Sequence, residues 1–109
     1  MINIILACQY GASTDLLAAK MQEVAKEKNL DVLVNAYSFT DLEQYIESAD
    51  IVLLGPQIRF KQNELSKKFA DKDVEFKVID TADYGMLNGE SVLMKALEDI
   101  SKKEEVKSQ

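Results

Sequence analysis

The sequence predicts an α/β fold: an open four-stranded parallel sheet of order 2-1-3-4 with helices on both faces. Two observations lead to this prediction. Four short apolar runs alternate along the chain with segments whose apolar residues recur at helical spacing. The first run is apolar almost throughout, as expected of a central parallel strand buried on both faces. Strands that alternate with helices in this way pair in parallel through helical crossovers.

The first half of the chain divides into strand, helix, strand and short helix. INIILA, residues 2–7, is the predicted central strand. Over residues 14–28 the apolar positions recur every three to four residues, which predicts a helix with one buried face. DVLVNAY, residues 31–37, predicts the second strand. TDLE opens a short helix over residues 40–48, because a threonine followed three residues later by glutamate has capping-box spacing.

The second half continues the same alternation. DIVLLG, residues 50–55, is the clearest strand and stops at a Gly-Pro pair. Spaced apolar residues predict a helix over 61–70, and EFKVID predicts the fourth strand over 75–80. TADYGMLNGE, residues 81–90, is predicted to be a loop. A last helix is predicted over 92–100 from its apolar spacing.

Size and composition predict one globular domain. The chain has 109 residues, of which 47% are hydrophobic and 29% charged, so a core can form. We assign residues 1–103 to this domain and residues 104–109 to a charged tail. The last helix is expected to fray after residue 100, where the chain becomes solvated. The apolar runs fall far short of the roughly 18 residues of a membrane span, and the N-terminus lacks a basic leader. The expected location is the cytoplasm, without insertion into the membrane.

Charge and residue types exclude several functions. The net charge is −6 and Arg59 is the only arginine, which disfavours binding to nucleic acid or to an anionic membrane. The chain has no histidine and a single cysteine, Cys8. An intrachain disulfide, a Cys-x-x-Cys motif, a Cys-His dyad and a histidine-based metal site are therefore excluded. We expect no metal and no cofactor, and a protein or a small molecule as the partner.

The predicted sheet brings three loops together around Cys8. In a flavodoxin-like sheet, ligands bind beyond the carboxyl ends of the strands, near the point where the strand order reverses. Residues 8–14, 55–60 and 80–87 follow three of the strands and would meet at this edge. Cys8 lies at the end of the central strand and would occupy the centre of the shared rim.

The segment CQYGAST places Cys8 directly before a helix N-terminus. Such a terminus offers unpaired backbone N–H groups and a positive dipole end, which bind anions and stabilise a thiolate. Gly11 lets the backbone curl towards a ligand, and Ser13 or Thr14 can cap the helix. The segment therefore favours a cysteine nucleophile in a phosphate-binding loop. A small buried side chain is the competing interpretation of Cys8.

The same loop is similar to that of low-molecular-weight tyrosine phosphatases, whose motif is Cys-x5-Arg-Ser/Thr. Counted from Cys8, the arginine position holds Thr14, so the guanidinium that clamps the phosphate is missing. No Asp-Pro acid loop is present, although Asp80 and Asp83 lie on the predicted rim. We expect these carboxylates to face away from a bound phosphate or to cap the loop. The pattern favours a carrier that passes a phosphoryl group on without hydrolysing it.

Three segments together resemble the IIB component of the lactose/cellobiose family of the sugar phosphotransferase system. They are the Cys-x-x-Gly-x-Ser-Thr-x-Leu-Leu motif that starts at Cys8, ADIVLLGPQI at residues 49–58, and VIDTADYGMLNG at residues 78–89. The resemblance extends over nearly the whole chain, from Ile2 to about Ile100. The length is most similar to stand-alone proteins of the cellobiose or N,N′-diacetylchitobiose branch.

The resemblance implies a function in a phosphoryl relay. A family member accepts a phosphoryl group from a phosphohistidine of its IIA partner and carries it as a cysteinyl phosphate. It then passes the group to a β-linked disaccharide in the membrane-embedded IIC permease, at the inner face of the membrane. The phosphocysteine corresponds to Cys8. The phosphate loop corresponds to Gln9, Tyr10, Gly11, Ala12, Ser13 and Thr14, acting mainly through backbone amides.

Other positions on the rim are candidates for partner docking. Many relatives have a small residue after the cysteine, whereas this chain has Gln9-Tyr10, and Tyr10 would either shield the loop or contact a partner. The remaining docking candidates are Pro56, Gln57, Ile58 and Tyr84. Arg59 is either a phosphate clamp or a solvated surface residue. Two alternative functions stay open at this point: a flavodoxin-like module that binds the phosphate of FMN, and a degenerate low-molecular-weight phosphatase.

Overall fold

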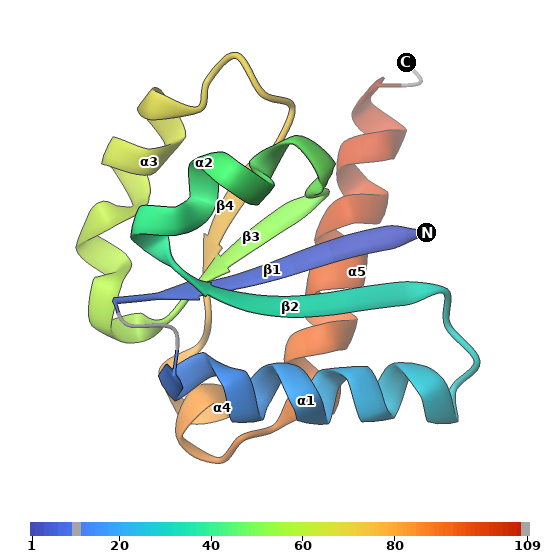
Figure 1. Ribbon diagram of the computed structural model, residues 1–109. Helices are drawn as coiled ribbons and strands as arrows, with labels where there is room; N and C mark the ends of the chain where they lie inside the picture. Colours follow the sequence, from blue (N-terminus) through green and yellow to red (C-terminus); the bar gives the residue numbers. More distant parts are fainter. Residues whose placement is uncertain (10–11, 108–109) are drawn as a thin grey trace.

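The computed structural model, which describes residues 1–9 and 12–107, contains the predicted four-stranded parallel sheet (Figure 1). The strands pair in the order β2-β1-β3-β4. Their bounds are β1 (Ile2–Cys8), β2 (Val32–Ser38), β3 (Ile51–Leu54) and β4 (Glu75–Val78). The sequence prediction of fold class and strand order is therefore confirmed.

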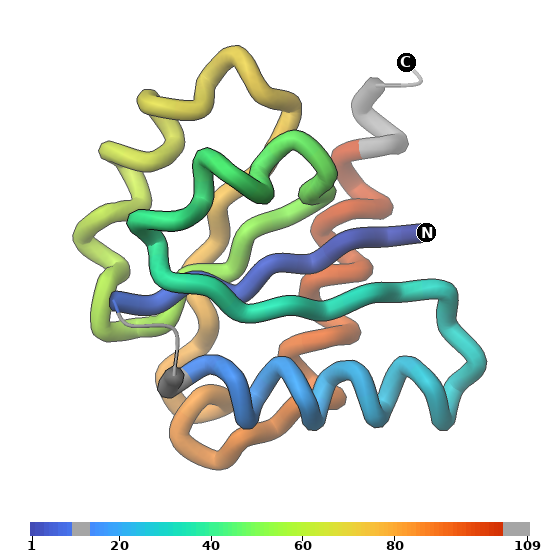
Figure 2. The backbone as a smooth tube through the Cα atoms, in the orientation of Figure 1, coloured from blue at the N-terminus to red at the C-terminus, as the bar shows by residue number. Residues whose placement is uncertain are grey.

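Helices cover both faces of the sheet, as Figures 1 and 2 show. On one face lie α1 (Ala12–Glu27) and α5 (Gly89–Lys107). The other face is covered by short helical turns and α3. In chain order these are η1 (Phe39–Asp41), α2 (Leu42–Tyr45), η2 (Ile46–Ser48), η3 (Pro56–Lys61) and α3 (Gln62–Lys68). The predicted rim loop over 55–60 is thus largely a 3₁₀ helix that leads into α3.

Alternating residues of β1 divide between two apolar clusters. Ile4 and Leu6 pack towards α1 and α5, whereas Ile5 and Ala7 pack towards α2 and α3. Successive side chains of a strand point to opposite faces, so a strand buried on both faces must be apolar at every position. The same alternation directs Cys8, the last residue of β1, to the face that carries α1.

The structure differs from the sequence prediction after β4. Residues 81–90 were expected to form a loop, but α4 (Thr81–Gly85) occupies half of this segment and α5 begins within it. Asn88 caps α5, because its Oδ1 accepts a hydrogen bond from the Ser91 N–H at 3.1 Å. Two side chains of the segment also pack against the core: Tyr84 and Leu87.

The final helix is longer than the apolar spacing predicts. The backbone of α5 stays helical to Lys107, through residues 101–107 that we expected to fray into a solvated tail. Lys103 holds this part of the helix, because its Nζ donates to the Asp73 carbonyl at 2.8 Å and forms an ion pair with the same residue's carboxylate. This contact joins residues 30 apart in the chain, and the local pattern carries no signal of it.

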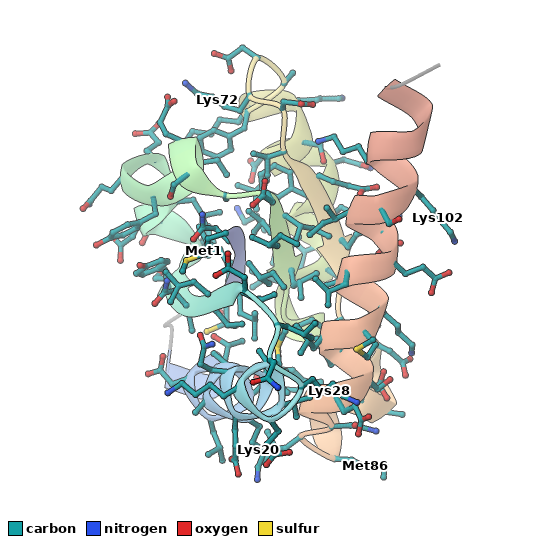
Figure 3. The ribbon with its side chains drawn as sticks, turned by 90° about the vertical axis from the view of Figure 1, so that its right-hand side faces the viewer. Met1, Lys20, Lys28, Lys72, Met86 and Lys102 are labelled. Carbon is teal, nitrogen blue, oxygen red and sulfur yellow. The ribbon has the colours of Figure 1, made fainter. Side chains whose placement is uncertain are left out.

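Gly89 allows α5 to start directly against α1. A β-carbon at Gly89 would lie 2.9 Å from the carbonyl carbon of Lys20 and 2.9 Å from the backbone nitrogen of Met21. Figure 3 shows Lys20 and Met86, three residues before Gly89, at the same end of the molecule. By contrast, a β-carbon at Gly85 would meet no atom within 4 Å. The two glycines therefore form a matched pair with different surroundings.

We predict that Gly89→Ala lowers the free energy of unfolding by about 1–3 kcal/mol, because the added methyl group must push α5 away from the α1 backbone. Gly85→Ala should leave the free energy unchanged or raise it slightly, since alanine is the better helix former. Urea denaturation of both variants measures the difference. Equal stabilities would contradict the close approach.

Candidate functional site

Cys8 ends β1 at the carboxyl edge of the sheet, as predicted. Its side chain is only 2% exposed. β1 is a central strand, with β2 on one side and β3 on the other. Cys8 pairs in register with Ser38, the last residue of β2. The backbone of Cys8 is therefore held by pairing with β2, one residue beyond the end of the pairing with β3, at the point where the strand order reverses.

Thr14, in the first turn of α1, contacts the cysteine directly. Its Oγ1 donates a hydrogen bond to the Cys8 Sγ at 3.5 Å, and the Thr14 side chain is fully buried. A hydroxyl that donates to sulfur favours the thiolate over the thiol. Thr14 stands where a low-molecular-weight phosphatase has its arginine. The position thus carries a donor to the sulfur in place of a cation for the phosphate.

The Gly55-Pro56 turn lies on the other side of Cys8. A β-carbon at Gly55 would be 3.6 Å from the Cys8 Cβ and 3.0 Å from the Gln57 Oε1. The Gly55 N–H donates to the Ala7 carbonyl at 2.8 Å, which fixes the turn against the end of β1. The side chain of Gln57, an exposed residue, therefore lies against Gly55.

The predicted docking residues fall into two groups. Pro56, Gln57 and Tyr84 border a common groove of about 630 Å³. Arg59, Phe60, Thr81 and Gly85 complete the lining of this groove. Ile58 does not reach it, because its side chain is 1% exposed and packs in the core beneath α3. The expectation that Ile58 contacts a partner is therefore wrong.

Three side chains give the groove its character. Phe60 is 73% exposed, although it is large and apolar. The hydroxyl oxygen of Tyr84 is buried and has no hydrogen-bond partner among the described residues. Arg59 is exposed and lines the groove. The groove thus combines an exposed aromatic ring with one cation.

The predicted phosphate loop is described only in part. Gln9 is exposed, and its carbonyl accepts a hydrogen bond from the Ser38 hydroxyl at 2.8 Å. Tyr10 and Gly11 lie outside the described residues. Ala12 and Ser13 open α1, and their side chains are also outside the described part of the chain. Of the six predicted loop residues, Thr14 is thus the one whose side-chain contact with Cys8 is seen.

The carboxylate of Asp83 is held by two side chains of α5. Its Oδ2 accepts hydrogen bonds from the Lys95 Nζ at 2.8 Å and the Ser91 hydroxyl at 2.9 Å. These two donors on α5, the lysine first, lower the pKa of Asp83 below its ordinary value. These two contacts occupy the Asp83 carboxylate; the expectation that it faces away from a bound phosphate or caps the loop stays a prediction.

The described residues offer no group of three or more His, Cys, Asp and Glu side chains that could hold a metal ion. Among the same residues, no helix is long and apolar enough to cross a membrane.

A comparison with known protein families identifies the family of this chain. A sequence model of the family described as "PTS system, Lactose/Cellobiose specific IIB subunit" matches residues 3–95. The chain belongs to this family. As a IIB component it is part of a sugar phosphotransferase system, whose IIB components act as phosphotransferases together with IIA and IIC components.

Similar proteins cover almost the whole chain. The galactose-specific EIIB component of Lactococcus lactis subsp. cremoris is 40% identical over 98 residues, which is 85% of this chain and 91% of that protein. The cellobiose-specific EIIB component of Lactococcus lactis subsp. lactis is 39% identical over the same length and the same shares. The solution structure of a cellobiose-specific IIB component from Borrelia burgdorferi has a TM-score of 0.78 and is 36% identical, covering 94% of each chain.

The Ser38 contact was missed by sequence reasoning. Ser38 follows the apolar run of the second strand and carries no motif of its own. Its position beside Cys8 depends on the register of β1 and β2, which one sequence does not display. The sequence offers only a weak signal of this contact. A hydroxyl residue stands at the end of the second predicted strand, which is expected to pair with the strand that ends at Cys8.

We predict that Thr14→Val raises the pKa of the Cys8 thiol above its value in the parent protein, because the variant keeps the side-chain volume and loses the donor to sulfur. Cys8 is the only cysteine in the chain, so ultraviolet thiolate absorbance followed against pH reports this group alone. Cys8→Ser supplies the blank for the tyrosines. An unchanged titration midpoint would show that the Thr14 hydroxyl does not act on the sulfur.

Proposed function

We propose that the chain carries a phosphoryl group on Cys8, taken from a phosphohistidine of a IIA protein and delivered to a β-linked disaccharide held by a IIC permease. Membership of the IIB family supports the relay. The observation that carries the choice of residue is the placement of the single cysteine at the end of β1, in hydrogen-bond contact with the first turn of α1.

The chemistry consists of two displacements at phosphorus. In the first, the Cys8 thiolate attacks the phosphorus, the S–P bond forms, and the N–P bond breaks with its electron pair returning to the imidazole. In the second, a sugar hydroxyl attacks the same phosphorus, its proton passes to a base, and the S–P bond breaks to restore the thiolate. The described part of the chain supports both steps by its helix N-terminus, where phosphate dianions are favoured.

The absence of a phosphatase arginine suits a carrier. An arginine at position 14 would stabilise the transition state for transfer to water as well as to sugar. Thr14 instead donates to the sulfur, which stabilises Cys8 both as attacking thiolate and as leaving group. The chain has no histidine, so the phosphohistidine donor must come from another protein. We place this exchange in the cytoplasm, at the inner face of the membrane.

We propose the groove bordered by Pro56, Gln57 and Tyr84 as part of the partner-docking surface, together with Tyr10. The exposed Phe60 ring supports this proposal, because exposed aromatic side chains are enriched in protein interfaces. The sugar is proposed only by class. Two relatives of nearly equal identity carry the names galactose-specific and cellobiose-specific, so sequence identity does not select between these sugars.

We predict that Cys8→Ser abolishes phosphoryl transfer from a phosphorylated cellobiose-family IIA protein to sugar in a reconstituted relay. The serine hydroxyl is a far weaker nucleophile than a thiolate, and the expected loss is on the order of a thousandfold or more. Sugar phosphate formed per minute is the measurement. Ser48→Ala, which removes a hydroxyl at the end of η2, is the control and should retain full transfer.

Relay activity that persists in Cys8→Ser would end the proposal. Release of inorganic phosphate by the parent chain in the absence of sugar would instead identify a phosphatase. A circular-dichroism spectrum equal to that of the parent establishes that the serine variant is folded.

A further inference from the structure

Ser38 forms a hydrogen bond next to the cysteine that the proposed function does not use. Its Oγ donates to the Gln9 carbonyl at 2.8 Å and lies 3.0 Å from the Thr40 Oγ1. Gln9 is the residue directly after Cys8. The hydroxyls of Ser38, the last residue of β2, and of Thr40 therefore connect to the backbone carbonyl of the residue after the cysteine.

The direction of this hydrogen-bond chain follows from counting protons. A serine hydroxyl has one proton, and Ser38 donates it to the Gln9 carbonyl. The Thr40 hydroxyl must then donate to Ser38 when both bonds are present. The Thr40 N–H also points at the Ser38 Oγ, at 3.4 Å, and gives the oxygen a second donor. Hydrogen bonds in a chain polarise one another, and this strengthens the last bond, here the bond from Ser38 to the Gln9 carbonyl.

The fold holds Ser38 rigidly in this position. Tyr37 and Phe39, its chain neighbours, both pack against the apolar cluster beneath α2 and α3. Tyr37 also stacks on Tyr45, with ring centroids 3.8 Å apart. Side chains alternate along a strand, so Ser38 projects to the opposite face, which is also the face of Cys8. The register pairs Ser38 with Cys8, which places the two on adjacent strands and on the same side.

A fixed Gln9 carbonyl matters for a loop that binds phosphate. The loop stabilises an anion only if its N–H groups converge on the site and its carbonyl oxygens point elsewhere. The carbonyl and N–H of a trans peptide group point in opposite directions. Engaging the Gln9 oxygen therefore fixes the direction of that carbonyl. Without a donor, this oxygen is free to turn towards the anion and repel it.

We propose that Ser38, supported by Thr40, is a positioning residue for phosphoryl transfer, which acts by holding the Gln9 carbonyl out of the anion site. The predicted effect on the rate of phosphoryl transfer rests on the proposed function of Cys8. The predicted effect on the ionisation of the Cys8 thiol does not depend on that function. The thiolate of Cys8 and a phosphoryl group bound to it are both anions at the same place, so the hydrogen bond from Ser38 to the Gln9 carbonyl favours both.

The experiment compares Ser38→Ala, Ser38→Thr and Ser48→Ala in the full chain. Ser48 is the matched control, because its hydroxyl also donates to a backbone carbonyl, that of Tyr45 at 3.2 Å, on a segment that leads into β3. Two quantities are measured for each variant. One is the pH midpoint of Cys8 thiolate absorbance; the other is kcat and KM for phosphoryl acceptance from phosphorylated IIA.

We expect Ser38→Ala to raise the thiolate midpoint and to lower kcat roughly three- to tenfold, the scale of one lost hydrogen bond, with KM little changed. Ser38→Thr keeps the hydroxyl and should restore both values, whereas Ser48→Ala should match the parent throughout. Ser38→Ala values equal to those of Ser48→Ala would overturn the proposal. A change in KM alone would also overturn it, since it would indicate partner binding and not positioning.

The two hypotheses fail in different ways. If the parent chain accepts no phosphoryl group, the proposed function fails, and the thiolate midpoint still tests Ser38. If the parent accepts phosphate and the Ser38→Ala midpoint and kcat are unchanged, only the positioning role fails.

Discussion

The fixed position of the Cys8 sulfur at the carboxyl end of β1 is the constraint on which the rest of the structure depends. β1 is central and buried on both faces, so its direction and register are determined by two apolar clusters and two neighbouring strands. A buried strand of this kind scarcely moves, because interiors are close-packed. Cys8 is therefore attached to a rigid strand although it lies at the carboxyl edge of the sheet. Under the proposed function, this rigid placement of the sulfur contributes to the rate of phosphoryl transfer.

Each neighbouring element contributes one feature around that sulfur. α1 brings its N-terminus and the Thr14 hydroxyl, β3 ends in the Gly55 turn that lies against the cysteine, and β2 ends in Ser38. None of these residues is cationic. In its described part the site therefore offers backbone dipoles and hydroxyl donors. Such a site suits the proposed carrier function, in which a phosphoryl group is bound for a short time and then transferred. Tight binding of the phosphoryl group would slow the second transfer.

Much of this arrangement could be predicted from the sequence because it depends on local pattern. The apolar run before Cys8, followed closely by a helix start, correctly predicted that Cys8 ends the central strand. Features set by long-range register could not be read in this way. Ile58 looked like a rim residue, but the 3₁₀ turn that starts at Pro56 directs it inwards. Likewise, the Gln22 carboxamide pairs with the backbone of β2 at Val32 and Val34, a contact with no local signal.

The most direct test of the central claim is phosphorus NMR of the full chain after incubation with phosphorylated IIA. Resonances of sulfur-linked, oxygen-linked and nitrogen-linked phosphoryl groups are distinct, and the chain contains one sulfur nucleophile and no histidine. We predict a single sulfur-linked resonance that persists in acid and disappears when sugar and IIC are added. An oxygen-linked resonance, from Ser13, Thr14 or a tyrosine, would contradict the assignment of Cys8 as the carrier.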